Sequence, residues 1–219
     1  MEALSLRLPG GRPVLEKVSW SLPPGSKLMV KGQAAHEVTA FLQLCAGLLH
    51  PQSGRVRLGG EVLAPYRLSH PFLERGALAW VPAGGGLLAN QSLLANVSLP
   101  LRFVRGLPRA IAEARAMEWL ERAGLDPLAG HRPHAMTPQE RWMGALARSG
   151  ASGAELWLVD PPQGGLSPAM RRKAWEILGP VLESPGGTAL LAEDGPWLMD
   201  PPRHWLHLEN GTLTSGSAP

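Results

Sequence analysis

Hydrophobic and polar positions follow two different patterns along the chain. Residues 4–8 and 14–22 alternate between apolar and polar side chains and are separated by proline and glycine, which predicts short antiparallel strands. Apolar runs of strand length recur later, at 27–30, 77–81, 155–159 and 188–192. Helical spacing at 38–49 and 170–178, between or after such runs, predicts a parallel sheet covered by helices on both faces. The expected fold class is therefore α/β, with an antiparallel β region at its start.

Residues 84–150 have a helical character of their own. Apolar positions in the middle of this region recur every three residues among arginine and glutamate, at Ile111, Ala114, Met117 and Leu120. This spacing predicts an amphipathic helix that buries those four side chains. Residues 214–219 are small and polar, which predicts a disordered tail. We therefore expect one domain at 1–213, with a helical subdomain at about 84–150, followed by the tail.

Composition and charge exclude several classes of protein. The 219 residues are 44% hydrophobic and 18% charged, unlike a disordered chain. The net charge is +3 and the basic residues form no run, so a nucleic-acid partner is not expected. Cys45 is the single cysteine, which excludes an intrachain disulfide framework and fits a reducing compartment. Since no apolar run approaches the ~18 residues needed to span a bilayer, the protein would act at a membrane only through another chain.

The segment Gly32-Gln-Ala-Ala-His-Glu-Val-Thr39 lies between the strand at 27–30 and the helical pattern at 38–49. A strand, a glycine turn and a helix in this order are typical of a loop that binds phosphate with its backbone amides.

Taken with this loop, the order of the elements resembles the nucleotide-binding subunit of ATP-binding-cassette (ABC) transporters over nearly the whole chain. The matching segments follow the family's order: the phosphate loop at 32–39 with Pro51–Gly54 after it, the Q-loop region at Val81–Ala83 and 87–97, the signature at Met136–Glu140 followed by Ala145–Arg148, the Walker B strand at Leu156–Pro162, the D-loop at Leu166–Pro168, the switch strand at Leu190–Asp194 and the closing hairpin at Leu208–Gly211. The resemblance implies a P-loop NTPase-like (RecA-like) core with an N-terminal antiparallel β subdomain and a helical subdomain. It also implies an integral-membrane permease as partner.

The phosphate loop departs from the family pattern at the positions that hold the nucleotide. Only Gly32 and the hydroxyl of Thr39 remain, while Ala35 and Glu37 replace family glycines and Val38 replaces the lysine. A contact between unit charges at ~4 Å is worth roughly 4 kcal/mol at an effective dielectric of 20, which is about three orders of magnitude in affinity. The loop therefore predicts loss of ATP binding, and no cofactor is expected unless the degenerate site still binds ATP and magnesium.

Other positions that are catalytic in the family also hold residues that cannot perform the family's roles. Pro161 stands where the family has the glutamate that activates water, and a proline cannot accept a proton. Glu193 replaces the switch histidine and Ala83 replaces the Q-loop glutamine. The aromatic residue expected to stack on adenine near Leu8 is missing. Asp160 remains and could hold magnesium through water, or it could be structural. These substitutions predict a chain without catalytic residues.

The signature segment suggests how the vestigial sites are filled. Thr137, Pro138, Gln139 and Glu140 form a capping-box pattern, in which Glu140 reaches back to the first residue of the cap. Glu37 stands just before the helix expected from Val38, where a carboxylate could replace a phosphate. Our hypothesis is that both carboxylates occupy former anion sites, and a solvated Glu37 remains the alternative.

The segment after the Q-loop offers a possible docking surface for the permease. In the family this surface receives a short helix of the membrane subunit, and Ala83 with Leu87, Leu88, Leu93 and Leu94 could line it. Packing of these leucines inside the helical subdomain is an equal alternative. Two histidine pairs, His131 with His134 and His204 with His207, lack the clustered partners of a metal site, so none is expected.

The preferred interpretation is a catalytically degenerate cassette subunit, cytoplasmic and peripheral on the inner face of the cell membrane. It would dimerise with itself or with a competent ATPase. The stretch Leu94–Arg102, followed by 109–125, is weakly similar to the ATPases of MCE-type lipid transporters. Two alternatives stay open: an atypical ATPase that binds Mg-ATP through Thr39 and Asp160, and a soluble scaffold or regulatory protein that keeps the fold.

Overall fold

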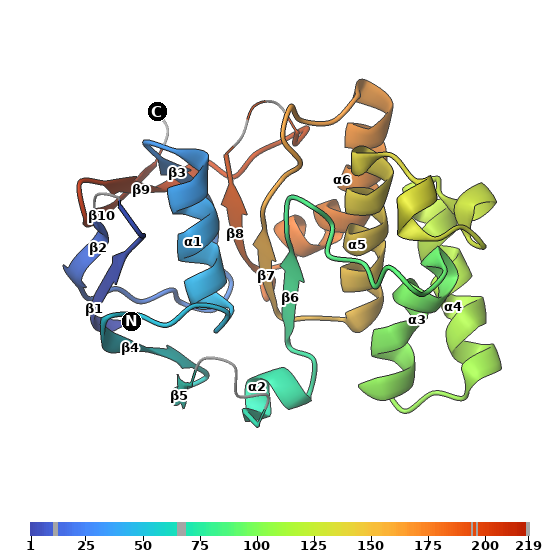
Figure 1. Ribbon diagram of the computed structural model, residues 1–219, viewed down its shortest axis with the longest axis horizontal. Helices are drawn as coiled ribbons and strands as arrows, with labels where there is room; N and C mark the ends of the chain where they lie inside the picture. The colour runs from blue at the N-terminus through green and yellow to red at the C-terminus, as the bar shows by residue number, and fades with distance from the viewer. Residues whose placement is uncertain (11–12, 65–68, 194, 196, 218–219) are drawn as a thin grey trace.

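A six-stranded sheet forms the centre of the molecule (Figure 1). The computed structural model describes residues 1–217 except 11–12, 65–68, 194 and 196. The strands lie in the order β10 (Thr212–Ser217), β9 (His204–Glu209), β3 (Lys27–Gly32), β8 (Thr188–Ala192), β7 (Leu156–Val159) and β6 (Leu78–Val81). Every neighbouring pair is parallel except β9 with β10. The predicted parallel sheet is confirmed.

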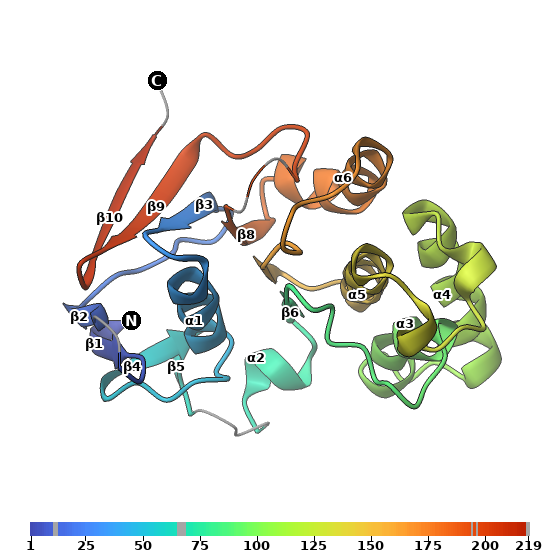
Figure 2. The same cartoon turned by 45° about the horizontal axis from the view of Figure 1, so that its top comes forward.

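Helices cover both faces of this sheet, as predicted. α1 (Ala35–Cys45) lies on one face, and α5 (Pro138–Ser152) and α6 (Pro168–Glu183) lie on the other (Figures 1 and 2). Strand β7 shows the reason, because Leu156 and Leu158 join the hydrophobic cluster on the α1 side, while Trp157 and Val159 join the cluster on the α5 side. A strand that is apolar at every position can be stable only between two layers.

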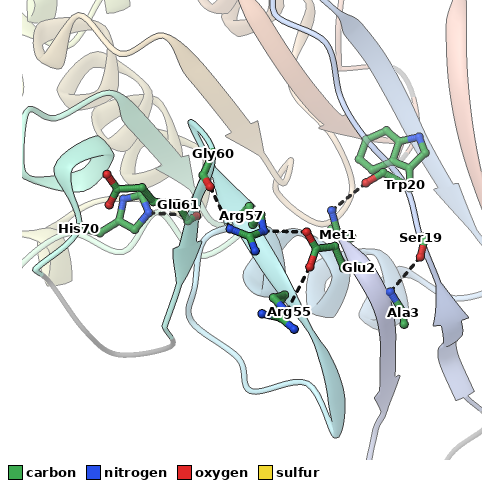
Figure 3. A network of polar contacts seen from close by, with 10 residues as sticks. All are labelled: Met1, Glu2, Ala3, Ser19, Trp20, Arg55, Arg57, Gly60, Glu61 and His70. Atoms are coloured by element: carbon green, nitrogen blue, oxygen red, sulfur yellow. Dashed lines mark hydrogen bonds and ion pairs between the residues drawn. The ribbon is translucent and has the colours of Figure 1, made fainter.

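A second, antiparallel sheet packs beside α1. Its strands lie in the order β2 (Pro13–Val18), β1 (Glu2–Arg7), β4 (Ser53–Leu58) and β5 (Glu61–Leu63). Figure 3 shows that Glu2 bridges β1 and β4, with its two oxygens 2.7 Å from Arg57 Nε and 3.1 Å from Arg55 Nε. The hydrogen bond from Arg57 lowers the pKa of Glu2. These side chains are about half exposed, so the sheet depends on its buried face more than on the ion pairs.

The remaining helices form a layer at the far side of α5. They are α3 (Leu93–Phe103) and α4 (Arg109–Ala123), with short 3-10 turns at Asp126–Leu128 and Pro133–Ala135, while the four-residue α2 (Pro71–Glu74) precedes β6. The predicted helical subdomain is therefore present. Among the residues that the structure describes, no helix has both the length and the hydropathy needed to cross a bilayer.

The buried face of α4 differs from the predicted one. Its buried residues are Ala112, Ala116, Leu120 and Ala123, whereas Ile111 is 48% exposed and Ala114 is also exposed. A strict three-residue repeat drifts around a helix of 3.6 residues per turn, while spacings of four and three stay on one face. The small alanines were overlooked because they carry little hydrophobic signal, although their size lets α4 lie close to its neighbours.

The predicted disordered tail is also wrong for the described part of residues 214–219. β10 pairs with β9 in unbroken register from Thr212 opposite Glu209 to Ser217 opposite His204. Its small, polar residues suit an edge strand, since backbone hydrogen bonds rather than side-chain burial hold it. Gly216 fits here because a Cβ would lie 2.5 Å from the Trp205 ring. Residues 218 and 219 lie outside the described residues.

Two glycines of α5 set the distance to α3 and α4. A Cβ at Gly144 would lie 2.6 Å from Leu93 Cδ1, and one at Gly150 would lie 2.4 Å from the Trp119 ring. Contacts this short do not occur between real carbon atoms, so α5 can carry only hydrogen at these two positions in this packing. The three helices are therefore held in one arrangement by close packing.

We expect Gly150→Ala to destabilise the protein by about 1–3 kcal/mol, because the added methyl group must displace the Trp119 ring. Gly130→Ala is the matched control, since a Cβ there meets nothing within 4 Å. Urea unfolding followed by tryptophan fluorescence measures both variants. Equal stabilities for the two variants would contradict the close packing of α4 on α5.

Candidate functional site

The carboxyl ends of the parallel strands bring the predicted site residues to one edge of the sheet. Val30 of β3 pairs with Ala192 of β8, and Val159 of β7 pairs with Leu191. Consequently Gly32, Asp160 and Glu193, each at or just beyond the end of its strand, gather at the carboxyl edge of the sheet. In open α/β sheets this edge is where ligands bind. Asp194, the last residue of the predicted switch strand, lies outside the described residues.

The first turns of α1, which follow the loop after β3, place hydrocarbon where a phosphate-binding segment needs positive charge. Val38 is only 3% exposed, and its Cγ2 lies 2.8 Å from the position that a Cβ would take at Gly32. The valine side chain therefore folds back over the glycine that begins the loop. No lysine or arginine occurs between Gly32 and Thr39, so the segment supplies no cation for a triphosphate.

Thr39 and Asp160, the two positions kept from the family pattern, contact each other directly. The Thr39 hydroxyl donates to Asp160 Oδ2 at 2.7 Å, and Asp160 is buried at 6% exposure. The backbone of Asp160 is also fixed, because its N–H donates to the Val81 carbonyl and its carbonyl accepts from Trp142 Nε1, both at 2.8 Å. The aspartate therefore links α1, β6, β7 and α5, a structural role that needs no ion.

Glu193, at the switch position, forms an ion pair that sequence reasoning did not anticipate. Its Oε2 lies 2.9 Å from Lys31 Nζ, and its N–H donates to the Val30 carbonyl at 2.9 Å. The two side chains are 42% and 44% exposed, so the pair contributes little to stability. The pair matters more for ligand binding, because it pairs the positive charge of Lys31, the lysine nearest the phosphate loop, with a carboxylate. The sequence feature that could have predicted this pair is that Lys31 and Glu193 stand at the same level near the ends of two parallel strands, β3 and β8, which are neighbours in the sheet.

The groups that could accept a proton are poorly placed for hydrolysis. Pro161, which follows Asp160, is buried and offers only hydrocarbon. Burial also raises the pKa of the Cys45 thiol to about 12, so this cysteine stays neutral and is no nucleophile at physiological pH. Among the described residues, no group of three or more His, Cys, Asp or Glu side chains could hold a metal ion.

The capping box predicted at the start of α5 is confirmed. The Glu140 N–H donates to Thr137 Oγ1 at 3.3 Å, and Glu140 Oε2 accepts from the Thr137 N–H at 2.7 Å. Pro138 occupies the first turn, and Gln139 Nε2 donates to the Gly165 carbonyl at 3.2 Å. Side chains thus bind two of the amides at this helix terminus, and Gln139 joins the segment to the turn before α6.

The expected start of α1 near Val38 is wrong, and the occupation of a former anion site by the Glu37 carboxylate stays a prediction. α1 begins at Ala35 rather than near Val38, so Glu37 lies inside the first turn, at the third helical position that Glu140 occupies in α5. The N-cap of α1 is Ala34, which has no side-chain oxygen and makes no side-chain cap. Within the described part of the chain, Glu37 makes no hydrogen bond to the helix amides. Without a hydroxyl at the N-cap, the reciprocal pair cannot form.

The proposed docking leucines differ in exposure, which corrects part of the predicted surface. Leu93 is fully buried, and Leu87 and Leu94 pack partly buried against the helical core. Only Leu88 is largely exposed, at 47%. The leucines are therefore mainly packing residues, as the alternative interpretation held, and Leu88 alone presents an apolar side chain to a partner.

Buried polar groups hold the segment around Leu88 in place. Asn96, which is fully buried, accepts from the Leu88 N–H at 2.7 Å and donates to the Leu88 carbonyl at 3.1 Å. On the other side, Arg148 donates to the Gly86 carbonyl at 3.0 Å, and burial lowers the pKa of this arginine. Gly85 packs on α5, where a Cβ would lie 2.7 Å from the Arg141 carbonyl. The loop from Ala83 to Leu88 is thus held in a fixed position on α3 and α5.

The residues at this edge do not fit Mg-ATP. The loop holds a buried valine and a glutamate in place of the lysine and a glycine, and Lys31 is paired with Glu193. Thr39 and Asp160 supply oxygen ligands of the kind that magnesium prefers, but they already bind each other. Thr39 is thus paired with Asp160 and Lys31 with Glu193, and Glu37 presents negative charge to an incoming anion.

Residues 15–164 match the protein-family model described as ABC transporter. The lipoprotein-releasing system ATP-binding protein LolD of Ruegeria sp. is 32% identical over 207 residues, covering 94% of this chain and 90% of that protein. The Fe(3+) ions import ATP-binding protein FbpC of Pseudomonas fluorescens is 30% identical over 83% of this chain, which spans 50% of that protein. The dimeric ATP-binding cassette MJ0796, solved with ADP and Pi, covers 100% of this chain and 97% of its own at 20% identity and a TM-score of 0.83. The fold is therefore that of an ATP-binding cassette.

We expect Thr137→Ala to lower the free energy of unfolding by about 1 kcal/mol, since it removes one half of the capping box. Thr137→Ser keeps the hydroxyl and is the matched control. Chemical denaturation monitored by circular dichroism compares the two variants. A serine variant as destabilised as the alanine variant would show that the hydroxyl does not cap α5.

Proposed function

The chain belongs to the ABC transporter family, and on that premise we propose that it is a cassette subunit that no longer binds or hydrolyses ATP. It would act as a structural partner of an integral-membrane permease, peripheral on the cytoplasmic face of the cell membrane. The observation that carries this proposal is the buried Val38 side chain lying over Gly32, in the place of a phosphate-binding lysine.

The charge at the loop supports the loss of nucleotide binding. Replacing a lysine by Val38 removes a positive charge, and Glu37 adds a negative one to the first turn of α1. Each contact with a phosphate charge at ~4 Å is worth roughly 4 kcal/mol at an effective dielectric of 20, or about a thousandfold in affinity. Either substitution alone would weaken a micromolar site to about millimolar, and the two together would weaken it further.

The catalytic positions support the loss of hydrolysis independently of binding. Pro161 cannot activate water, and Glu193 places a carboxylate where a hydrogen-bond donor to phosphate is needed. Glu140 binds the first amide of the signature helix, the kind of group that would otherwise contact a phosphate held by a second cassette. These changes would leave a composite site incomplete even with a competent partner.

The partner and the cargo follow from the family only in outline. LolD and FbpC are named as ATP-binding proteins of transport systems, and we propose that this chain serves a transport system as well. It would pair with itself or with a competent ATPase. The similarity to ATPases of MCE-type lipid transporters stays a prediction about the cargo.

One observation favours a second candidate, an atypical ATPase. Thr39 and Asp160 keep their oxygens within 2.7 Å of each other at the usual end of the phosphate loop. A magnesium ion could replace the proton between them and carry a nucleotide with it. This candidate predicts magnesium-dependent nucleotide binding by the unmodified chain.

A thermal-shift titration with Mg-ATP separates the two candidates. We expect no change in Tm for the natural chain and an increase for the triple variant Ala35→Gly, Glu37→Gly, Val38→Lys, which restores the glycines and the lysine. Binding at a hundredfold excess over Kd adds about 2.7 kcal/mol, which is several degrees for a protein of this size. A saturable increase for the natural chain would support the atypical ATPase instead.

Docking on a permease is tested by co-purification. We expect the tagged chain, isolated from detergent-solubilised membranes of its own host, to bring down an integral-membrane permease identified by mass spectrometry. Leu88→Glu should reduce the yield of permease at least tenfold, because it places a charge in the apolar contact. Met199→Glu, at a methionine that is 57% exposed and lies outside this loop, is the control. Recovery without any permease would favour a soluble scaffold.

A further inference from the structure

The loop that joins α3 to α4 exposes an unusual combination of side chains. The two helices form an antiparallel hairpin, and their connection lies at the lower right of Figure 1, far from the carboxyl edge of the sheet. Phe103 ends α3 with 73% of its surface exposed, Val104 is 38% exposed, and Ile111 in the first turn of α4 is 48% exposed. We call residues 102–111 the hairpin tip.

The apolar side chains of the hairpin tip are not required by the core beneath them. Leu107, in the same loop, is partly buried and packs against the helical cluster, so its side chain closes the core there. Its N–H donates to the Leu101 carbonyl at 3.0 Å, which fixes the loop on the end of α3. Phe103 is the most exposed of the large hydrophobic side chains that the structure describes. An aromatic side chain held at the end of a rigid helix, with its core already closed, marks a contact surface.

The charges of the hairpin tip all have the same sign. Arg102, Arg105 and Arg109 lie within it, and residues 102–112 contain no aspartate or glutamate. The Arg102 guanidinium stacks 5.0 Å from the centre of the Phe103 ring, and Arg105 donates to the Ser152 carbonyl at 2.8 Å. Arg109 pairs with Glu113 one turn later in α4, but Arg102 and Arg105 form no ion pair with the described residues. The charges of Arg102 and Arg105 thus have no acidic partner among the described residues, although one nitrogen of Arg105 is engaged by the Ser152 and Gly153 carbonyls.

From this arrangement we propose that the hairpin tip binds the surface of an anionic lipid bilayer. Phe103, Val104 and Ile111 would enter the interface between headgroups and acyl chains, while Arg102 and Arg105 contact lipid phosphates. A flat surface suits the tip better than the helix of a protein partner, because the exposed apolar residues lie where the α3–α4 hairpin turns, at the edge of the molecule (Figure 1). The contact involves neither the nucleotide edge nor Leu88, so it is independent of the proposed function.

Co-flotation of the purified chain with lipid vesicles tests the proposal. We expect the chain to float with vesicles that contain phosphatidylglycerol but not with pure phosphatidylcholine vesicles, and to be released by high salt. An arginine near an anionic surface contributes about 1 kcal/mol, roughly a fivefold change in partitioning. Arg102→Ser should therefore weaken partitioning about fivefold, and Phe103→Ser should weaken it several-fold at any salt concentration.

Matched variants elsewhere on the surface give the controls. Arg172→Ser removes an exposed arginine of α6, and Met199→Ser removes a methionine that is 57% exposed, so both should float like the natural chain. Unchanged thermal unfolding of each variant shows that its fold is intact. Three results would overturn the proposal: no flotation with anionic vesicles, equal flotation with zwitterionic ones, or flotation that the two tip variants leave unchanged. Failure here would leave the permease co-purification result unaffected.

Discussion

The central constraint on this molecule is the balance of charge at the carboxyl edge of its parallel sheet. That edge collects backbone amides and carboxylates from several strands, and a functional cassette needs cations there to hold a triphosphate. Here the loop supplies Val38 and Glu37, and the nearby lysine, Lys31, is paired with Glu193. Thr39 and Asp160 bind each other, and Glu140 caps the signature helix. Several polar side chains of this edge are therefore paired with one another, while the N-terminus of α1 has no side-chain cap.

If the proposed loss of nucleotide binding holds, contacts within the chain must stabilise the fold in place of the ligand. The two hydrophobic layers that meet on β7 hold the core, with Val38 packed into the layer on the α1 side, and α5 is fixed by close contacts of Gly144 and Gly150 with its neighbours. Buried Asn96 and Arg148 hold the loop that presents Leu88. Loss of phosphate ligands would be tolerated because the side chains that once faced the ligand now contact one another. The surfaces that we propose for protein and lipid partners lie on the helical layer, away from that edge.

Much of the fold could be predicted from local signals in the sequence. The fully apolar strands required two covering layers, and the Thr137–Glu140 pattern specified its own cap, because both depend on interactions between near neighbours in the chain. The buried face of α4 was mispredicted because alanine packs by its small size rather than by its hydrophobicity. The strand at 212–217 was missed because its stability comes from backbone pairing with β9, which side-chain composition does not encode.

The site was less predictable because its contacts are long-range. Residue types alone indicated which nucleotide-binding and catalytic positions differ from the family pattern. The pairing of Lys31 with Glu193, however, depends on the order of β3 and β8 in the sheet. Burial of Leu93 depends on the close approach of Gly144, and the missing cap at Glu37 depends on where α1 begins. Each of these is set by tertiary geometry, so sequence reasoning could name the residues without fixing their contacts.

The central claim is that this edge cannot hold a nucleoside triphosphate, and calorimetric titration of the purified chain with ATP and magnesium tests it most directly. A cassette with an intact phosphate loop serves as the reference in the same buffer. The account predicts no heat of binding at cellular concentrations of nucleotide. A saturable isotherm with one nucleotide per chain, abolished by Asp160→Asn, would contradict it.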